Sequence, residues 1–168
     1  MEKVSLSCCF TGYRPQKMPF LIDDDNPQFK KFENMLVAKI LELINAGCTT
    51  FYTGMAMGFD IIAAEAVLLA KEVTDTPVEL YAVIPYKNQD KSFPYDWKSR
   101  YERIIKKCDK AILLCDSYNR TCFFLRNQFM VDNSDIVLTY FDGKSGGTKS
   151  TVDYAARKGR QVINLYNE

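Results

Sequence analysis

One segment restricts the fold of this chain more than any other: an apolar run, a loop with two glycines, and then an amphipathic helix. Residues 49–52 are typical of a buried strand, and residues 60–73 have the apolar spacing of a helix. Gly54 and Gly58 lie between them, in the segment TGMAMGFD. Glycine lets a backbone turn sharply and approach a ligand closely. The free N–H groups at the start of such a helix favour anions, above all phosphate.

The whole chain alternates β-like runs with helical patterns. The expected strands are residues 4–10, 49–52, 78–84, 110–114, 135–141 and 161–166. The expected helices are residues 29–46, 60–73, 96–107, 123–133 and 148–158. Such alternation produces right-handed βαβ units. The sequence therefore predicts an α/β fold, a Rossmann-like, doubly wound, mainly parallel sheet with helices on both faces. Without a linker or repeat, residues 1–168 are expected to form one domain.

Three expected strand-end loops collect the unusual residues: 11–15, 53–60 and 143–148. Ligands bind at the carboxyl ends of parallel strands, so these loops are predicted to meet at one edge of the sheet. Gly146, Gly147 and Thr148 open a helix and form a second candidate phosphate cradle. The first glycine loop matches neither a Walker A nor a GxGxxG fingerprint, and each loop alone fits an ordinary tight turn equally well. Two at one edge favour a nucleotide-sized anion.

Two arginines are candidate phosphate ligands. Arg14 precedes Pro15 on a stiffened turn, where a guanidinium can clamp a phosphate with two hydrogen bonds. Arg126, beside Asn127, lies on an expected helix. The alternatives are a solvated Arg14 and an Arg126 bridge to Asp116. Apolar residues of the same helix are expected to face the core: Phe124, Leu125, Phe129, Met130 and Val131.

Asp60 follows the first glycine loop and has two interpretations. A carboxylate in a first helical turn stabilises the helix by about 0.3–1 kcal/mol. The same carboxylate can hydrogen-bond a ribose hydroxyl or act as a base. Glu65, further along this helix, is expected to have a structural or orienting role.

Aromatic residues mark the expected loop between residues 85 and 97. Together with Gln89, three of them have two interpretations: Tyr86, Trp97 and Tyr101. They form either a lid that stacks on a base or a satellite hydrophobic cluster. If Phe93, Tyr95 and Trp97 do not fold inward, they mark a surface for self-association.

Composition excludes several classes of function. The net charge of +1 argues against a surface that coats nucleic acid. The chain has no histidine, which excludes Ser-His-Asp and Cys-His mechanisms. Its six cysteines include no CxxC pair, so no metal site is predicted and the thiols are expected to be reduced. With no signal-peptide pattern and no membrane-length apolar run, a cytoplasmic location is expected.

At these residues the sequence resembles the SLOG superfamily of Rossmann-like proteins, specifically its YpsA-like bacterial branch. The resemblance rests on FTGYRP from Phe10, TGMAMGFDIIAAE from Thr53, RNQFMVDNSD from Arg126, and the segment from Tyr140 to Ala155. The series Pro85, Gln89, Trp97 and Tyr101 completes it. These elements span nearly the whole chain in order.

The resemblance implies a pocket for a nucleotide or nucleotide derivative at the sheet edge. The superfamily includes cytokinin-activating phosphoribohydrolases, which cut the N-glycosidic bond of a nucleoside monophosphate, the DNA-processing protein DprA, and proposed sensors of nucleotide signals. YpsA-like proteins are linked to stress and cell-division phenotypes. Relatives often form homodimers, so a homodimer is an expected assembly.

The sequence departs from the hydrolase pattern. Those enzymes carry a PGGxGTxxE-type loop, whereas Lys149 stands here where a glycine is expected and Asp153 replaces a glutamate.

The sequence is compatible with two functions. In the first, a nucleotide-binding sensor or regulator, phosphate is held by Gly54, Gly58, Gly146, Gly147, Thr148, Arg14 and Arg126, with Thr11, Gly12 and Asn127 also in the site. Asp60 contacts ribose. In the second, an N-glycosidic hydrolase, Asp60 or Asp153 assists the attack of water. A DNA-binding module is disfavoured by the neutral charge balance.

Overall fold

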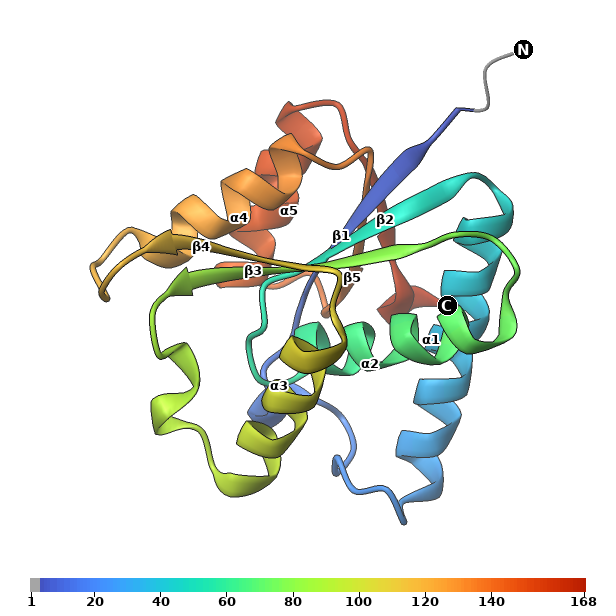
Figure 1. The fold of residues 1–168 in the computed structure, drawn as a ribbon, viewed down its shortest axis with the longest axis horizontal. Helices are drawn as coiled ribbons and strands as arrows, with labels where there is room; N and C mark the ends of the chain where they lie inside the picture. Colours follow the sequence, from blue (N-terminus) through green and yellow to red (C-terminus); the bar gives the residue numbers. More distant parts are fainter. Residues whose placement is uncertain (1–3) are drawn as a thin grey trace.

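The structure is a computed structural model, and it describes residues 4–168. A six-stranded parallel sheet lies between two layers of helices (Figure 1). The strands are β1 (Leu6–Gly12), β2 (Cys48–Thr53), β3 (Glu79–Tyr86), β4 (Lys110–Cys115), β5 (Ile136–Tyr140) and β6 (Gln161–Asn164). The α-helices are α1 (Pro27–Asn45), α2 (Phe59–Val73), α3 (Tyr95–Lys107), α4 (Cys122–Asp132) and α5 (Gly147–Arg157). Short 3-10 helices are η1 (Pro15–Lys17), η2 (Gln89–Ser92) and η3 (Leu165–Asn167).

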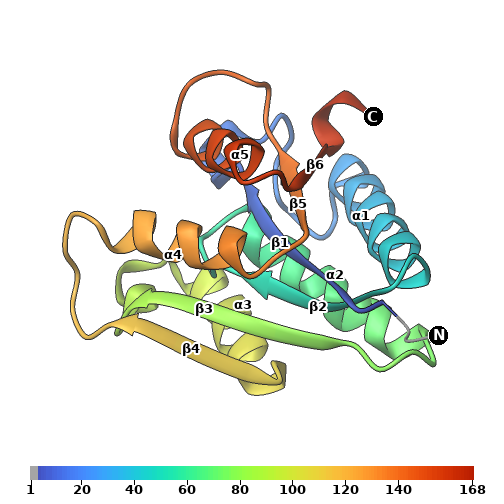
Figure 2. The same ribbon diagram turned by 90° about the horizontal axis from the view of Figure 1, so that it is seen from above.

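The sheet order creates a switch point beside the central strand β1. The strands lie in the order β4-β3-β2-β1-β5-β6, which Figure 2 shows from one edge to the other. The chain first adds β2, β3 and β4 on one side of β1, then adds β5 and β6 on the other. Because each crossover is right-handed, this reversal places α1, α2 and α3 on one face and α4 and α5 on the opposite face (Figure 1). The predicted Rossmann-like α/β fold is confirmed.

Side chains that alternate along β1 serve two hydrophobic cores. Cys8 lies in the larger core, between the sheet and α1, α2 and α3, and Cys9 lies in the smaller core under α4 and α5. Burial raises the pKa of both thiols, that of Cys9 to about 12. Both cysteines therefore pack as protonated, small hydrophobic residues.

Several predicted boundaries were wrong at the strand ends. Thr11 and Gly12 belong to β1 rather than to a turn, because they pair with Thr139 and Tyr140 of β5. Pro85 lies inside β3 instead of ending it. Beyond Ala82, β3 pairs only with β4 and no longer with β2. Proline has no backbone N–H to donate, and a strand that is paired on one side only can accommodate this.

The expected orientation of α4 was also wrong in part. Phe124 and Leu125 are 52% and 43% exposed. The buried residues Cys122, Arg126 and Met130 recur every four positions, so the buried stripe of α4 runs through the arginine. A helix that is apolar on several sides does not reveal which side faces the sheet.

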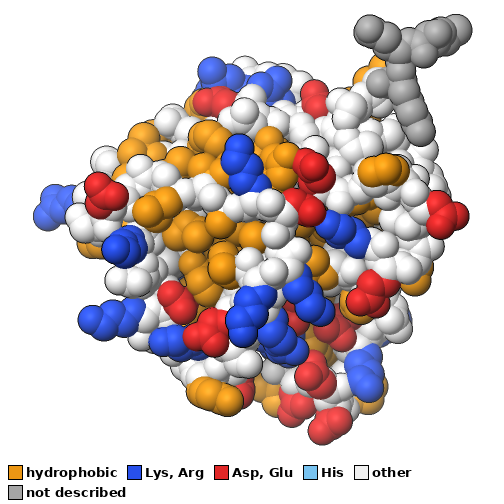
Figure 3. Space-filling model, viewed as in Figure 1, with side chains coloured by type: hydrophobic (Ala, Val, Ile, Leu, Met, Phe, Trp, Pro, Cys, Tyr) orange, Lys and Arg blue, Asp and Glu red, His pale blue; other side chains and the backbone are white. Residues whose placement is uncertain are grey.

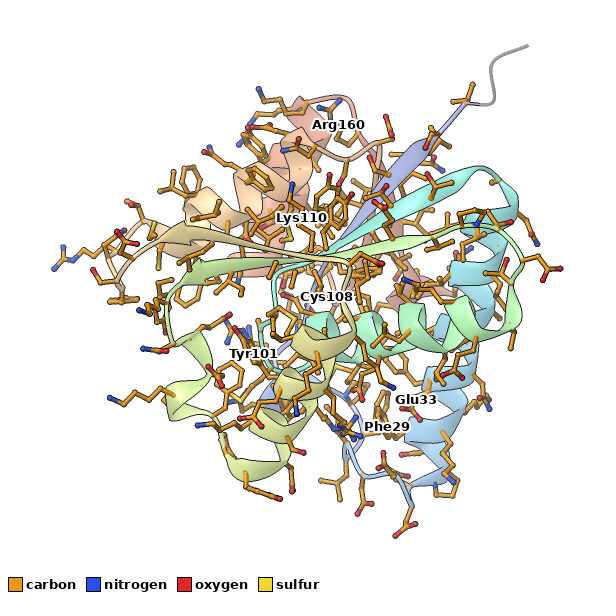
Figure 4. The ribbon with its side chains drawn as sticks, viewed as in Figure 1. Phe29, Glu33, Tyr101, Cys108, Lys110 and Arg160 are labelled. Atoms are coloured by element: carbon orange, nitrogen blue, oxygen red, sulfur yellow. The ribbon has the colours of Figure 1, made fainter. Side chains whose placement is uncertain are left out.

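The aromatic residues around η2 separate into two groups. Trp97 and Tyr101 pack with the larger core itself rather than in a separate satellite cluster. Of the residues expected to mark a self-association surface, Phe93 and Trp97 pack inward, whereas Tyr95 is 84% exposed. Figure 4 shows Tyr101 on α3, below the sheet, with Phe29 and Glu33 on α1 at the same side. Tyr86 instead contacts Phe123, at the start of α4.

The surface over the edge of the sheet is mixed in character. Figure 3 shows hydrophobic side chains over β3 and β4, with Lys and Arg side chains below them over α3. Leu113 of the edge strand β4 is 46% exposed. Within residues 4–168, no helix has the length and apolar character needed to cross a membrane.

Candidate functional site

A cleft of about 910 Å³ opens at the carboxyl ends of β1 and β5, which is the switch point of the sheet. It is formed by the segment after β1, the start of α2, the middle of α4 and the segment from β5 into α5. The predicted residues that line it are Thr11, Gly12, Arg14, Asp60, Arg126, Asn127, Gly146, Gly147 and Thr148. Gly54, Gly58 and Asp153 do not line it.

The start of α5 presents open backbone to the cleft. Gly146 is the N-cap residue, and its φ of 152° lies in the region that favours glycine. A Cβ added at Gly147 would meet nothing within 4 Å, so space remains beside the first turn. The N–H groups of this turn and the Thr148 hydroxyl are therefore available to an anion.

The two glycines before α2 serve packing instead. A Cβ at Gly58 would lie 2.3 Å from the Tyr13 carbonyl oxygen, and Gly58 has a φ of 98°. The Phe59 N–H at the start of α2 donates to the same carbonyl at 3.0 Å. The loop before α2 is thus closed onto the segment after β1, and only Ala56 and Asp60 from this region reach the cleft.

Gly54 makes room for the buried Arg126. A Cβ at Gly54 would lie 2.8 Å from Arg126 Nε. The Arg126 side chain is held by two hydrogen bonds, from its NH1 group to the Gly54 carbonyl oxygen at 2.9 Å and from its Nε to Asn127 Oδ1 at 3.1 Å. The residue is 5% exposed. This arrangement fixes one guanidinium at the floor of the cleft.

Arg14 and Arg126 approach one aromatic ring. The guanidinium carbon of Arg126 lies 5.2 Å from the centre of the Phe123 ring, and that of Arg14 lies 5.9 Å from it. Both guanidinium groups are therefore within the range of a cation–π interaction with this ring. Arg126 accordingly interacts with Phe123 and the Gly54 carbonyl oxygen, and both arginines line the cleft.

Burial makes the ionised forms of Asp60 and Arg126 less favourable relative to their neutral forms. Burial raises the pKa of Asp60, while the charges of Arg126 and Arg14 and a hydrogen bond with the Ala56 backbone act in the opposite direction. Burial also lowers the pKa of Arg126, against the attraction of Asp60, and the like charge of Arg14 adds to the lowering. The guanidinium stays protonated at neutral pH. An anion bound beside the two arginines would relieve their repulsion.

Other residues of the cleft were not among the predicted ligands. They are Tyr13, Gln16, Lys17, Ala56, Phe141, Asp142, Lys144 and Ser145. The Tyr13 hydroxyl accepts a hydrogen bond from the Asp142 N–H at 2.8 Å, which joins the loops after β1 and β5. Lys144 lies in the predicted loop 143–148, so loop membership was the available signal for it, whereas Lys17 lies two residues beyond the predicted loop 11–15, at the end of η1. Both lysines add positive charge to the cleft.

Asp153 lies apart from this site. It forms an ion pair with Lys149, one turn earlier on α5, with an oxygen–nitrogen distance of 2.8 Å. Roughly half of its side chain is exposed, 49%. Of the two candidate catalytic carboxylates, Asp60 is the one that the fold brings to the cleft.

The sheet order and this cleft define a Rossmann-like protein with a basic cleft at the switch point. The family model described as the YspA SLOG family matches residues 8–167. The chain belongs to this YpsA family of SLOG proteins, as its sequence motifs predicted.

Two relatives from Bacillus match most of the chain. It is 30% identical over 156 residues to the uncharacterized SPbeta prophage-derived protein YoqJ of Bacillus subtilis (strain 168), covering 84% of this chain and 91% of that protein. It is 27% identical over 159 residues to a UPF0398 protein of Bacillus cereus (strain B4264), and the match covers 94% of this chain and 85% of that protein.

Solved structures share the fold at low sequence identity. DNA processing protein A from Helicobacter pylori, which binds single-stranded DNA, superposes with a TM-score of 0.63 at 18% identity. The match covers 95% of this chain but 64% of that chain. TM1055 superposes with a TM-score of 0.57 at 14% identity, covering 94% and 72%. Because a structural relative binds single-stranded DNA, the neutral charge balance is not a sufficient reason to disfavour nucleic acid for this fold.

Proposed function

We propose that this protein binds a nucleotide or nucleotide derivative through its phosphate and acts as a cytosolic sensor or regulator. The supporting observation is the convergence of Arg14, Arg126 and the open first turn of α5 on one cleft. Phosphate would be held by the N–H groups around Gly146 and Gly147 and by the two guanidinium groups. Asp60, which lines the same cleft, would accept a hydrogen bond from a ribose hydroxyl.

The position of the glycines changes how phosphate is held in this proposal. Gly54 and Gly58 act indirectly, since Gly54 gives space to Arg126 and Gly58 lets two loops approach each other. The direct backbone donors come from α5 alone. Phosphate therefore sits nearer to β5 than the first glycine loop suggested.

A second candidate is N-glycosidic hydrolysis of a nucleoside monophosphate. It is favoured by the position of Asp60, a buried carboxyl group that lines the cleft and whose pKa is raised by burial, because a carboxyl group can act as a general acid or base. Asp153 would have no part in this reaction, because it lies outside the cleft.

Calorimetric titration and thermal unfolding with inorganic phosphate, nucleosides and nucleoside mono- and diphosphates test the proposal. A ligand that binds only the folded state raises its stability by RT ln(1 + [L]/Kd). We expect phosphate-bearing compounds to stabilise the protein and nucleosides to have no effect. Arg14→Ala should weaken binding by about 10- to 100-fold, because a charge-assisted pair is lost. Arg120→Ala is the matched control, since this exposed arginine does not line the cleft.

Two results would overturn the proposal, and two others would favour another function. Equal effects of Arg14→Ala and Arg120→Ala, or no stabilisation by any phosphate compound, would overturn the proposal. Free base in the chromatogram after incubation, abolished in Asp60→Asn, would favour the hydrolase. Tighter binding of a single-stranded oligonucleotide than of any mononucleotide would instead point to nucleic acid.

A further inference from the structure

A second, smaller hollow adjoins the cleft on the α4–α5 side. It measures about 180 Å³ and lies between one face of α4 and one face of α5. Its lining residues are Phe124, Asn127 and Gln128 of α4 and Gly147, Ser150, Thr151 and Tyr154 of α5. The spacings of three, four and seven residues place each group on one side of its helix. We call this hollow the α4–α5 groove.

The groove is continuous with the cleft. Asn127 and Gly147 line both hollows. An added Cβ at Gly147 would meet nothing within 4 Å, so the backbone of α5 leaves the passage open. A group attached to a phosphate at the start of α5 can therefore enter the groove without leaving the first site.

The chemistry of the groove differs from that of the cleft. The cleft contains Arg14, Lys17, Arg126 and Lys144, whereas none of the residues that line the groove is charged. The groove instead combines two aromatic rings with amide and hydroxyl groups. Such a lining suits a neutral, planar heterocycle, which stacks on a ring and uses hydrogen bonds along its edge.

The two rings differ in freedom. The Tyr154 hydroxyl donates to Asp132 Oδ1 at 2.7 Å, which fixes that ring as a wall of the groove. Phe124 is 52% exposed although it is a large apolar residue. An exposed ring beside a hollow offers a face on which a planar group can stack.

The sizes of the two hollows indicate what they hold. Ligand pockets for whole small molecules span about 300–1,000 Å³, so the cleft is large enough for a nucleotide and the groove holds only a fragment. We propose that the groove is a subsite for a second nucleobase, and that the ligand belongs to the dinucleotide class, with two nucleosides joined through phosphate. This inference rests on the proposed function.

Calorimetry with three probes tests it: adenosine 5′-monophosphate, the 3′,5′-linked dinucleotide ApA, and diadenosine 5′,5′-diphosphate. We expect at least one dinucleotide to bind about 10-fold tighter than the monophosphate, the scale of one stacking contact. Phe124→Ala should remove this advantage while changing the affinity for the monophosphate less than twofold. Phe124→Trp, which keeps a stacking face, should retain the advantage.

Leu125→Ala is the matched control, because Leu125 is 43% exposed on the same helix and lines neither hollow. The Leu125→Ala variant should bind all three probes with the same affinity as the unmodified protein. If the monophosphate binds and neither dinucleotide binds tighter, or if the advantage survives Phe124→Ala, the groove is not a base subsite while the proposed function stands. Binding of none of the three probes would overturn this inference, and the proposed function would fall with it if inorganic phosphate and the other nucleotides do not bind either.

Discussion

Arg126 is the residue at which folding and the candidate site meet. It belongs to the buried stripe of α4, yet its guanidinium reaches the cleft. Burying a charge costs free energy unless hydrogen bonds compensate for it. The Gly54 carbonyl oxygen and Asn127 Oδ1 supply that compensation. The side chain is therefore held in place before any ligand arrives.

Replacing Gly54 should displace this arginine. In Gly54→Ala the new methyl group would lie 2.8 Å from Arg126 Nε and 2.9 Å from Cδ, so the guanidinium must shift. We expect a loss of about 1–3 kcal/mol in stability and a clear loss of phosphate affinity, measured by urea unfolding and calorimetry. In an Arg126→Ala background the same change should cost little, because the side-chain atoms that the new methyl group would meet are gone. Equal costs in both backgrounds would show that Gly54 does not act through Arg126.

The sequence allowed part of this site to be predicted. Arg14 could be selected because Pro15 stiffens its turn, and Arg126 because it lies beside Asn127 on an expected helix, since a guanidinium group in such a place can clamp a phosphate. The part played by Gly54 could not, since a glycine that makes room for a distant side chain looks the same as one that turns a backbone. Only the contact between Gly54, which directly follows β2, and Arg126 of α4 distinguishes the two.

At the scale of elements, the reversal of direction beside β1 produces the cleft. The chain leaves β1 for α1 on one face of the sheet and β5 for α5 on the other, and the cleft opens where these two paths separate. Alternation of apolar patterns was enough to predict the elements and the doubly wound sheet. The strand order was not readable from periodicity, because every buried parallel strand is apolar on both faces. The orientation of α4 was missed for a similar reason.

Asp109 connects three elements and should make stability depend on pH. Its carboxylate accepts hydrogen bonds from Lys71 Nζ of α2 at 2.7 Å and from the Leu80 N–H of β3 at 2.8 Å. Burial opposes ionisation, but these bonds outweigh it and lower the pKa of Asp109. The stabilisation is therefore present above the unfolded-state pKa of about 3.9 and is lost as pH falls through the lower folded-state pKa.

In Asp109→Asn, the free energy of unfolding should decrease less steeply as the pH is lowered than it does in the unmodified protein. Because 35% of the side chain is exposed and solvent screens the pair, the contribution is about 0.5–1 kcal/mol. Urea unfolding at a series of pH values from neutral to acid measures it. Asp75→Asn, at an exposed position, is the control. A variant whose stability falls with acid as steeply as that of the unmodified protein would contradict this account.

At the scale of the whole molecule, the end of the chain returns to support the cleft. The Tyr166 ring lies edge-on to Tyr140 and Tyr13, with ring centres 5.2 Å and 6.2 Å apart. Asn164 Nδ2 donates to the Phe141 carbonyl oxygen at 2.9 Å. The loops after β1 and β5 are thus tied to the last turn of the chain.

Tyr166→Ala should loosen this support. Two edge-on aromatic contacts are worth about 0.5–1.5 kcal/mol each beyond their buried area. We expect the unfolding temperature to fall by about 3–8 °C, read by circular dichroism, with a smaller loss of phosphate affinity. Tyr95→Ala provides the comparison, because that ring is 84% exposed. The same melting temperature for both variants would mean that the C-terminal residues do not brace the cleft.

The clustered cations of the cleft have a practical consequence. The like charges of Arg14 and Arg126 repel each other. Any small oxyanion of the medium, sulfate or phosphate included, relieves that repulsion and would compete with the physiological ligand. Purified protein should therefore carry an anion from its buffer. A binding free energy measured in phosphate buffer would then be the difference between the binding free energies of the ligand and of phosphate, rather than that of the ligand alone.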